Sequence, residues 1–549
     1  MCGITILWGA HITNETHQKS LDALKPRGPD VSTSEFLTSG NTTITVGFAR
    51  LHIQGDAGEE QPFRQESKLI LCNGEIYNAV RLVKQLGLER YVLPTSSDCV
   101  VVPALLASGM PFHEVVRQLD GDFAITIVDL SAETITVARD PYGVRPLFYA
   151  TNGDWSGLAS EIKAFPTGAT TVEAIEPGTI RIFPFVGAPQ PPHVWHQSPW
   201  LKTPYWKTTV ESLMEGCMAL RNALVESVIK RLAVAEGQEI GACLSGGLDS
   251  SVVAAIAALK LKETDKRLHT YSIGMEGSPD LKYARMVAEH IGSKHHERIV
   301  TSEECLAAIP AVVKAIESFD ITTVRASVGN YLVGRLVAET TPGVKVVLNG
   351  DGADEVLGGY LYMRYAPSDS AFELETDRLL REIHRYDVLR SERCMAAHGL
   401  ESRSPFLDRQ FVAVARSLPT DRLRSSEKFM EKLLLRSALK NTNVLPDEVV
   451  MRRKEAFSDG ISTVENSWFE MAKAAAATEG WEARAAAYVV NPPPTAEALW
   501  YRELFHESYP EAAASAVAPA MWMPRWVDAT DPSARTLPIY SPPQTSDTK

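Results

Sequence analysis

The segment Ser245-Gly246-Gly247-Leu248-Asp249-Ser250-Ser251 restricts the fold of this chain more than any other stretch. It follows the apolar run 240–244 and precedes the apolar run 252–259. A short buried strand, a loop of small residues and an apolar helix bring several backbone N–H groups to a helix N-terminus, where anions bind. Glycines let the backbone approach a ligand, and serine hydroxyls add donors without bulk. No lysine follows the glycines, so the loop is not of the kind that transfers a terminal phosphoryl group. We predict a phosphate-binding loop of another kind.

The composition favours small-molecule partners. The net charge of -13 over 549 residues argues against a nucleic-acid surface. No apolar run approaches the ~20 residues that span a bilayer, and the first residues lack the pattern of a signal peptide. We therefore expect a soluble, cytoplasmic protein that does not bind membranes. The 7 cysteines show no CxxC spacing, which predicts reduced thiols without a zinc site or a disulfide framework.

The chain begins Met1-Cys2-Gly3, and removal of Met1 would give Cys2 a free α-amine. An α-amine titrates near ~8, so it can act as a base for its own thiol. Further motifs follow in order: Arg27-Gly28-Pro29-Asp30, Arg50-Leu51-His52-Ile53, Asn73-Gly74-Glu75-Ile76-Tyr77-Asn78 and Ser97-Asp98-Cys99. With Cys2 they resemble the N-terminal-nucleophile (class II) glutamine amidotransferase family over residues 2–190. The resemblance implies an α+β layered sandwich (αββα) of the Ntn type. Strand-like patterns at 42–48, 68–72 and 123–128 agree with it.

The resemblance also implies a glutaminase site. Amide hydrolysis passes through an oxyanion, and the Asn73 side-chain amide and the Gly74 N–H suit it as donors. The guanidinium of Arg50 suits the substrate α-carboxylate, and the carboxylates of Glu75 and Asp98 suit its α-ammonium. In full, the expected glutamine-binding residues are Arg50, Leu51, His52, Ile53, Asn73, Gly74, Glu75 and Asp98, with Cys2, Asn73 and Gly74 as catalytic residues.

A proline-rich stretch from 183 to 206 separates two halves of the chain. We predict a glutaminase domain at 2–190, a linker at 191–210, a second domain at 211–530 and a mobile tail at 531–549. A helix is expected from about 210 to 235. Beyond the loop at 245–251, strand-like runs at 269–273 and 344–348 alternate with helical patterns, including one from Pro279 to about His290. This alternation predicts an α/β doubly wound parallel sheet with ligands at the carboxyl ends of its strands.

The segment 349–360 brings acidic groups to one such strand end. The side chains of Asp351, Asp354 and Glu355 would repel a triphosphate unless a hard cation lay between them. Mg²⁺ is therefore implied, with Asp249 and Asp354 as the preferred ligands.

The second half carries a more specific resemblance. The loop SGGLDS resembles the PP-loop of ATP pyrophosphatases, which cleave ATP between the α and β phosphates. The strings 273–280, 322–327, 349–360, 401–408, 453–460 and 499–505 extend the resemblance, nearly end to end, to the glutamine-hydrolysing asparagine synthetase family. That family implies ATP contacts at Leu244, Ser245, Gly246, Gly247, Asp249, Ser250, Ile273, Asn349, Gly350 and Lys454. It implies an aspartate pocket at Thr322, Thr323 and Arg325, and a catalytic acid at Asp351. Relatives are often dimers, so a homodimer is expected.

The reaction implied is ATP-dependent synthesis of asparagine from aspartate through β-aspartyl-AMP, with ammonia from glutamine. In the segment 349–360, three residues depart from the usual family pattern: Asn349 and Ala353 replace Ser, and Asp351 replaces Glu. Asp is shorter than Glu by roughly 1.5 Å, so substrate identity is less constrained than reaction type. Two alternatives stay open: a glutamine-dependent amide or lactam former that adenylates another carboxylate, and a non-catalytic binding protein that retains the fold.

Overall fold

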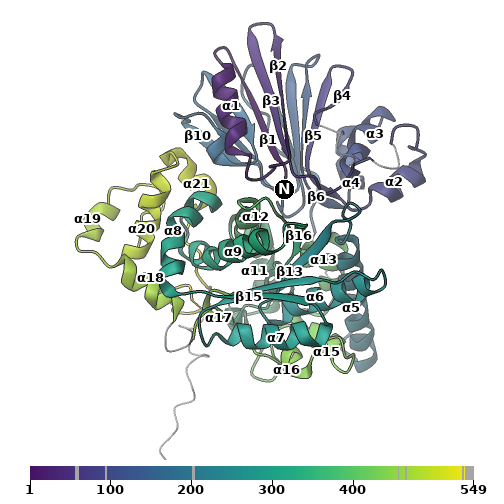
Figure 1. The fold of residues 1–549 in the computed structure, drawn as a ribbon, viewed down its shortest axis with the longest axis vertical. Helices are drawn as coiled ribbons and strands as arrows, with labels where there is room; N and C mark the ends of the chain where they lie inside the picture. The colour runs from purple at the N-terminus through teal and green to yellow at the C-terminus, as the bar shows by residue number, and fades with distance from the viewer. Residues whose placement is uncertain are drawn as a thin grey trace, which may run out of the picture.

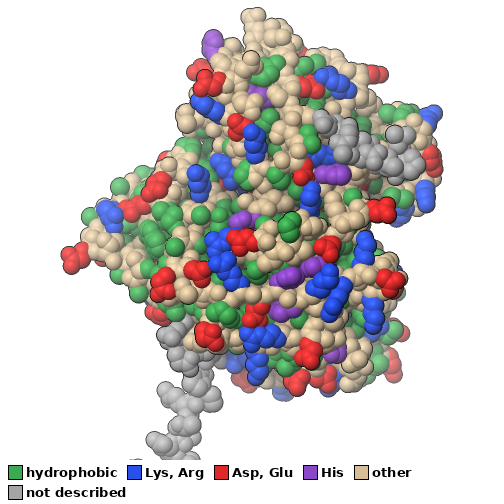
Figure 2. All heavy atoms as spheres, viewed as in Figure 1, with side chains coloured by type: hydrophobic (Ala, Val, Ile, Leu, Met, Phe, Trp, Pro, Cys, Tyr) green, Lys and Arg blue, Asp and Glu red, His purple; other side chains and the backbone are tan. Residues whose placement is uncertain are grey.

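The computed structural model describes residues 1–55, 61–92, 96–198, 200, 205–455, 457–463, 467–533 and 537. Two antiparallel sheets form the upper part of the molecule, and an α/β part lies below them (Figure 1). The N-terminus lies at the junction of the two parts (Figure 1). None of the described helices is both long and apolar enough to cross a membrane. On the face drawn in Figure 2, basic and acidic side chains are interspersed.

The upper part contains two six-stranded antiparallel sheets. In spatial order, the first consists of β10 (Thr171–Ala174), β8 (Phe148–Thr151), β9 (Trp155–Ala159), β1 (Gly3–Gly9), β3 (Thr42–Arg50) and β2 (Val31–Ser39). The second consists of β12 (His193–Val194), β11 (Thr179–Pro184), β7 (Thr134–Arg139), β6 (Gly121–Asp129), β5 (Lys68–Ile76) and β4 (Phe63–Gln65). The strands predicted at 42–48, 68–72 and 123–128 are β3, β5 and β6.

The two sheets pack face to face, because alternate residues of each strand point to the shared core. Ile4 and Ile6 of β1 meet Leu69 and Leu71 of β5 in one apolar cluster. The outer faces are covered by helices: α1 (Asn14–Ala23) on the first sheet and α2 (Ala79–Leu86), α3 (Val101–Ala107) and α4 (Phe112–Gln118) on the second. The predicted αββα sandwich is therefore confirmed.

The lower part is built on a five-stranded parallel sheet. Its order is β15 (Lys294–Ile299), β14 (His269–Gly274), β13 (Glu239–Cys243), β16 (Val344–Leu348) and β17 (Glu401–Arg403). One face packs against α5 (Val210–Lys230), α6 (Leu248–Lys262) and α7 (Pro279–Ile291), and the other against α8 (Ser302–Ile316), α9 (Ile321–Thr340) and α12 (Asp387–Ala396). Helices on both faces of a parallel sheet confirm the predicted doubly wound fold.

Further helices surround this sheet. They are α10 (Ala353–Leu357), α11 (Asp369–Glu382), α13 (Arg409–Ala415), α14 (Thr420–Leu423), α15 (Leu433–Leu439), α16 (Asp447–Val450), α17 (Phe457–Gly460), α18 (Trp468–Ala476), α19 (Trp481–Ala485), α20 (Ala496–His506) and α21 (Ala514–Val517). The C-terminal helices α18 to α21 lie at one side of the molecule (Figure 1).

The strand order determines where a ligand can bind. From β13 the chain adds β14 and β15 on one side, whereas β16 and β17 lie on the other. The order thus reverses between β13 and β16, and the carboxyl ends at such a switch point border a crevice. The loop 244–247 follows β13 and the acidic segment follows β16, so both predicted phosphate-site segments lie at this crevice.

Buried ion pairs join the two parts. Arg27 Nη1 lies 2.7 Å from Glu161 Oε1, and the same guanidinium binds Glu392 of α12. Arg393 Nη1 lies 3.0 Å from Glu161 and 3.2 Å from Glu317. All five side chains are almost fully buried. Because an unpaired buried charge costs several kcal/mol, this network ties the position of the upper part to that of the lower part.

One helix ends earlier than predicted, and two other predicted segments make contacts within the fold. Helix α5 ends at Lys230, about five residues early, because the chain turns back and Ala235 N–H donates to Ile53 O at 2.7 Å. The predicted linker 191–210 contributes β12, which pairs with β11. The predicted mobile tail begins with a buried Asp531 that is paired with Arg325. Residues 534–536 and 538–549 of that tail lie outside the described residues.

Candidate active sites

Cys2 lies at the start of an interior strand of the first sheet, at the junction with the lower part (Figure 1). It precedes β1, where Gly3 pairs with Ala49, and its side chain packs against the core between the sheets. Its Sγ lies 3.8 Å from Leu51 O. Burial raises the pKa of the Cys2 thiol. Activation therefore needs a nearby base.

Met1 still precedes Cys2, so the Cys2 nitrogen belongs to a peptide bond and the free α-amine belongs to Met1. That amine is buried, lies 3.4 Å from Leu400 O, and burial lowers its pKa to about 5. The base predicted for Cys2 therefore exists only after Met1 is removed.

Asn73 faces the same space as Cys2. It follows Leu69 and Leu71 at the two-residue spacing of β5, so its side chain points between the sheets. It is completely buried, and neither Asn73 Oδ1 nor Asn73 Nδ2 has a hydrogen-bond partner among the described residues. Leaving a buried amide without hydrogen bonds lowers the stability of the fold by about 1–3 kcal/mol. An amide in this state is therefore typical of a group that binds a ligand.

Gly74 allows close backbone packing beside Asn73. A Cβ at this position would lie 2.1 Å from Asp122 O in the neighbouring strand β6. A larger residue would thus separate β5 from β6 and displace the Gly74 N–H. The structure places the two predicted oxyanion donors side by side on a buried strand.

The segment Arg50–Ile53 is held from both parts of the molecule. Leu51 O contacts the Cys2 thiol, whereas His52 O accepts from Gln238 at 2.9 Å and from Lys345 at 3.3 Å. Arg50 Nη2 donates to Gln54 O at 3.1 Å. Residues 56–60, which follow this segment, lie outside the described residues.

Glu75 is a buried carboxylate and Asp98 a half-buried one, on neighbouring segments. Glu75 Oε1 lies 3.0 Å from Arg403 Nη2 of β17, and its other oxygen accepts from the Gln54 side chain. Asp98 Oδ2 accepts from the Ile76 N–H. Burial raises the pKa of both groups, that of Asp98 to about 6. Gln54 and Arg403 were missed from the sequence, because an isolated Gln or Arg has no local pattern that marks a site.

The phosphate-binding loop lines a cavity at the switch point. Gly246 has a φ of +71°, and a Cβ there would lie 2.5 Å from Ala284 N, so only glycine fits. The Ser245 and Ser250 hydroxyls lie 3.0 Å apart. The cavity is lined by Leu244, Ser245, Gly247, Asp249, Ser250, Ile273, Asn349, Gly350, Asp351, Asp354, Lys454, Thr322, Thr323 and Arg325. Every residue predicted for this site except Gly246 therefore borders one cavity.

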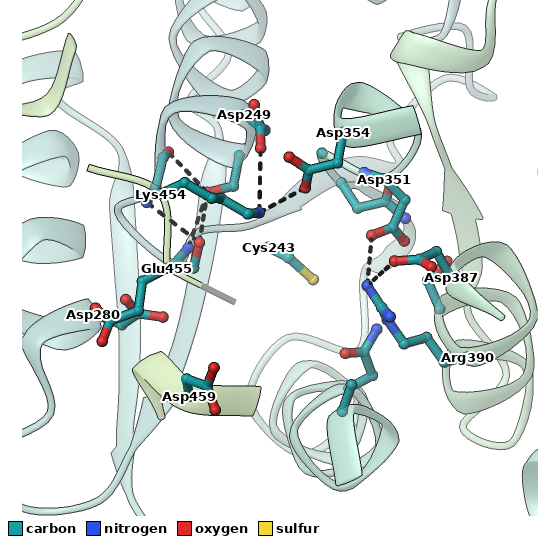
Figure 3. Close-up of a pocket in the computed structure, with 18 of the residues that line it drawn as sticks. Cys243, Asp249, Asp280, Asp351, Asp354, Asp387, Arg390, Lys454, Glu455 and Asp459 are labelled. Carbon is teal, nitrogen blue, oxygen red and sulfur yellow. Dashed lines mark hydrogen bonds and ion pairs between the residues drawn. The ribbon is translucent and has the colours of Figure 1, made fainter. Parts of the chain in front are cut away.

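Two lysines bind the carboxylates predicted as metal ligands. Lys432 Nζ lies 2.6 Å from Asp249 Oδ2 and 2.5 Å from Asp354 Oδ1. Lys454 Nζ lies 2.6 Å from Asp354 Oδ2 (Figure 3). Burial alone would raise the pKa of Asp354, but the two ammonium groups hold it well below its usual range. Lys432 was missed, since nothing in its sequence surroundings distinguishes it from a surface lysine.

Asp351 lies beside a second ion pair, between Arg390 and Asp387 (Figure 3). Its Oδ1 lies 3.7 Å from Arg390 Nη2, which also lies 2.5 Å from Asp387 Oδ1. Burial raises the pKa of Asp351 to about 6, and Arg390 opposes that rise. Asp387 and Arg390 lie one helical turn apart on α12, a spacing too common in helices to have indicated a site.

Asn349 is held by two hydroxyls from another segment. Asn349 Nδ2 donates to Ser402 Oγ at 2.7 Å, and Asn349 Oδ1 accepts from Ser404 Oγ at 2.9 Å. The same oxygen accepts from the Asp351 N–H at 3.1 Å. The side chains of Asn349, Ser402 and Ser404 are all buried. The side chain of Asn349, which is longer than the usual Ser, thus connects β17 to the backbone of Asp351, whose side chain is shorter than the usual Glu.

Replacing Asn349 by Ser should lower stability. The shorter side chain would leave the buried hydroxyls of Ser402 and Ser404 without this partner, at about 1–3 kcal/mol. We expect the unfolding midpoint to fall by about 1–1.5 °C per kcal/mol in differential scanning calorimetry, because the entropy of unfolding grows with chain length. The control is Asn41→Ser in the exposed β2–β3 turn. An unchanged midpoint for Asn349→Ser would show that this network does not stabilise the fold.

The residues predicted for aspartate lie on α9. Thr322 Oγ1 is buried without a hydrogen-bond partner among the described residues, whereas Thr323 Oγ1 donates to Asp320. Arg325 binds two carboxylates, Glu497 at 2.7 Å and Asp531 at 2.8 Å. Its guanidinium is thus largely engaged within the protein, whereas Arg390 Nη2 lies 3.7 Å from Asp351 Oδ1.

Comparisons with known proteins match both parts of the chain. The family described as "Glutamine amidotransferase domain" matches residues 1–208, and the family "Asparagine synthase" matches residues 219–378 and 366–529. The protein called "Asparagine synthetase [glutamine-hydrolyzing]" in Gallus gallus is 39% identical over 98% of this chain and 99% of its own length. The protein of that name in Homo sapiens is 38% identical over the same shares. The chain belongs to the glutamine-hydrolysing asparagine synthetase family.

Proposed function

We propose that this enzyme makes L-asparagine from L-aspartate, ATP and ammonia released from L-glutamine. The glutaminase site is assigned to residues 2–190 and the synthetase site to residues 211–530. Free thiols at all seven cysteines suit a reducing compartment, and we propose the cytoplasm. The products are asparagine, glutamate, AMP and pyrophosphate.

The glutaminase reaction is assigned to Cys2. Its thiol attacks the side-chain amide carbon of glutamine and forms a thioester, and ammonia leaves. Water then cleaves the thioester and releases glutamate. The base is the Cys2 α-amine, which removal of Met1 exposes. Asn73 and Gly74 stabilise the oxyanion, Arg50 holds the substrate carboxylate, and Glu75 and Asp98 hold its ammonium group.

Replacing Asn73 by Ala should slow glutamine hydrolysis by about 10²–10³-fold, because one oxyanion donor is lost. Synthesis from added ammonium should not change, since Asn73 lies outside the nucleotide cavity. Glutamate release and asparagine formation are measured on the same preparation. Asn41→Ala is the control. Full glutaminase activity in Asn73→Ala would reject the oxyanion assignment.

The synthetase reaction is assigned to the cavity at the switch point. An aspartate carboxylate oxygen attacks the α phosphorus of ATP, and the bond to the β-phosphate oxygen breaks, which releases pyrophosphate. Ammonia then attacks the acyl carbon of β-aspartyl-AMP, and AMP leaves. The phosphate-binding loop holds the triphosphate, Lys454 offsets its charge, and Asp351 with Arg390 positions the substrate carboxylate.

The donors in this cavity fit Mg²⁺. Asp249 and Asp354 offer carboxylate oxygens, and the buried Asp249 Oδ1 has no hydrogen-bond partner among the described residues. When bound, Mg²⁺ would supply positive charge that stabilises the departing pyrophosphate.

The position of β17 between the two sites supports the proposal that they act together. Leu400, just before it, accepts from the buried amine of Met1, next to Cys2. Ser402, two residues further, lines the nucleotide cavity and binds Asn349. Two residues of a strand span only about 7 Å. A short internal route therefore suits the transfer of ammonia, which bulk water would protonate.

A second candidate is a glutamine-dependent enzyme that adenylates another carboxylate, since Asp351 is shorter than the usual Glu. Pyrophosphate release is measured with L-aspartate, with L-glutamate and with β-amino acids. We expect release with L-aspartate and ammonium. Release with another acid and none with L-aspartate would favour the second candidate.

A further inference from the structure

Lys432 lies where the assigned metal ligands converge. Its Nζ is within 2.6 Å of both Asp249 and Asp354, and its side chain is only 1% exposed. The ammonium group therefore bridges the two carboxylates through short charge-assisted hydrogen bonds. Lys454 binds the remaining side of Asp354 (Figure 3). The two ammonium groups thus bind three of the four carboxylate oxygens of Asp249 and Asp354, and they leave Asp249 Oδ1 without a hydrogen-bond partner among the described residues.

The backbone around Lys432 is built for this placement. Lys432 has a φ of 57° and a ψ of 30°, a left-handed conformation that costs about 1–3 kcal/mol for a residue with a side chain. Gly359 leaves the necessary room, because a Cβ there would lie 2.2 Å from Lys432 Cε and 2.1 Å from Asp354 Oδ1. The close packing confines the ammonium to the space between the two aspartates.

Charge balance disfavours a free metal ion in this arrangement. Asp249 and Asp354 carry two negative charges, and Lys432 and Lys454 carry two positive charges, so the cluster is formally neutral. Mg²⁺ prefers six oxygen ligands. Among the described residues, no group of three or more His, Cys, Asp or Glu side chains could hold a metal ion. A triphosphate would bring both the missing oxygens and the negative charge.

We propose that Lys432 excludes divalent cations from the nucleotide-free pocket, so that the metal enters only together with a nucleoside triphosphate. The entering phosphates draw the Lys432 and Lys454 ammonium groups away from the aspartates and free their oxygens. The entry of the metal with a nucleoside triphosphate rests on the proposed function. The exclusion of the metal from the nucleotide-free pocket does not depend on it and can be measured on the protein alone.

The test is binding of Mn²⁺, followed by the electron paramagnetic resonance signal of the free ion. Wild type should bind Mn²⁺ alone only weakly, and it should bind one equivalent with an ATP analogue that has a methylene group between the α and β phosphates. Lys432→Gln should bind Mn²⁺ without nucleotide at least ~10-fold more tightly than wild type, because one adjacent positive charge is gone. Adding Asp249→Asn should abolish that gain. Lys260→Gln, on the exposed side of α6, should behave as wild type.

Tight Mn²⁺ binding by nucleotide-free wild type would overturn the inference, whatever the variants do. So would a Lys432→Gln protein that is folded by circular dichroism and gains no Mn²⁺ affinity. If the analogue does not bind to wild type, the proposed ATP site fails. The comparison of Mn²⁺ alone with wild type and Lys432→Gln still decides the role of Lys432.

Discussion

Replacing Cys2 by Ala should abolish asparagine formation from glutamine while asparagine formation from ammonium continues. The thiol is the only group assigned to attack glutamine, and loss of such a nucleophile lowers a rate by at least ~10³-fold. Cys2 packs against the core between the two upper sheets and does not line the nucleotide cavity. Each nitrogen source is supplied in turn, and asparagine is quantified by mass spectrometry.

The control for this result is Cys217→Ala, which removes a thiol from α5 outside both sites. It should leave both reactions unchanged. A folded Cys2→Ala protein that loses the ammonium-dependent reaction too would show that the two sites cannot be separated as we assign them. Retained glutamine use would reject Cys2 as the nucleophile.

Replacing Asp249 by Asn should have the opposite effect to Cys2→Ala: asparagine synthesis should be lost and glutamine hydrolysis retained. Both glutamine- and ammonium-dependent synthesis should fall by at least ~100-fold, because the phosphates and their counter-ion lose a positioning group. Glutamine hydrolysis itself should persist, since Asp249 belongs to the first turn of α6 in the lower part. Pyrophosphate, AMP and glutamate are measured in the same reactions.

Asp265→Asn, in the exposed turn after α6, is the matched control and should retain all three products. Normal AMP formation by Asp249→Asn would reject Asp249 as a metal ligand. Simultaneous loss of glutamine hydrolysis would mean instead that the upper site depends on the occupancy of the lower one.

Local patterns were sufficient for the elements that position the phosphates. The strand before Ser245, the helix after it and the strand before Asn349 lie where their apolar runs predicted. The strands β3, β5 and β6 likewise lie where the strand-like patterns at 42–48, 68–72 and 123–128 predicted them. In each case neighbouring residues carry the information, so the prediction needs no knowledge of distant contacts.

Contacts between distant segments could not be predicted in this way. Lys432 meets Asp249 across 183 residues of sequence, and Asn349 meets Ser402 across 53. Arg403 reaches Glu75 from the opposite part of the molecule. Nothing local marks these residues, because their partners are brought to them only by the docking of α15, β17 and the upper sheets.

The most direct test of the coupled account uses glutamine labelled with ¹⁵N in its side-chain amide, together with aspartate, ATP, Mg²⁺ and unlabelled ammonium as a competitor. We predict that most of the asparagine carries ¹⁵N in its side-chain amide, with one AMP and one pyrophosphate formed for each molecule. Label that appears only in free ammonium, or ADP and phosphate in place of AMP and pyrophosphate, would contradict the account.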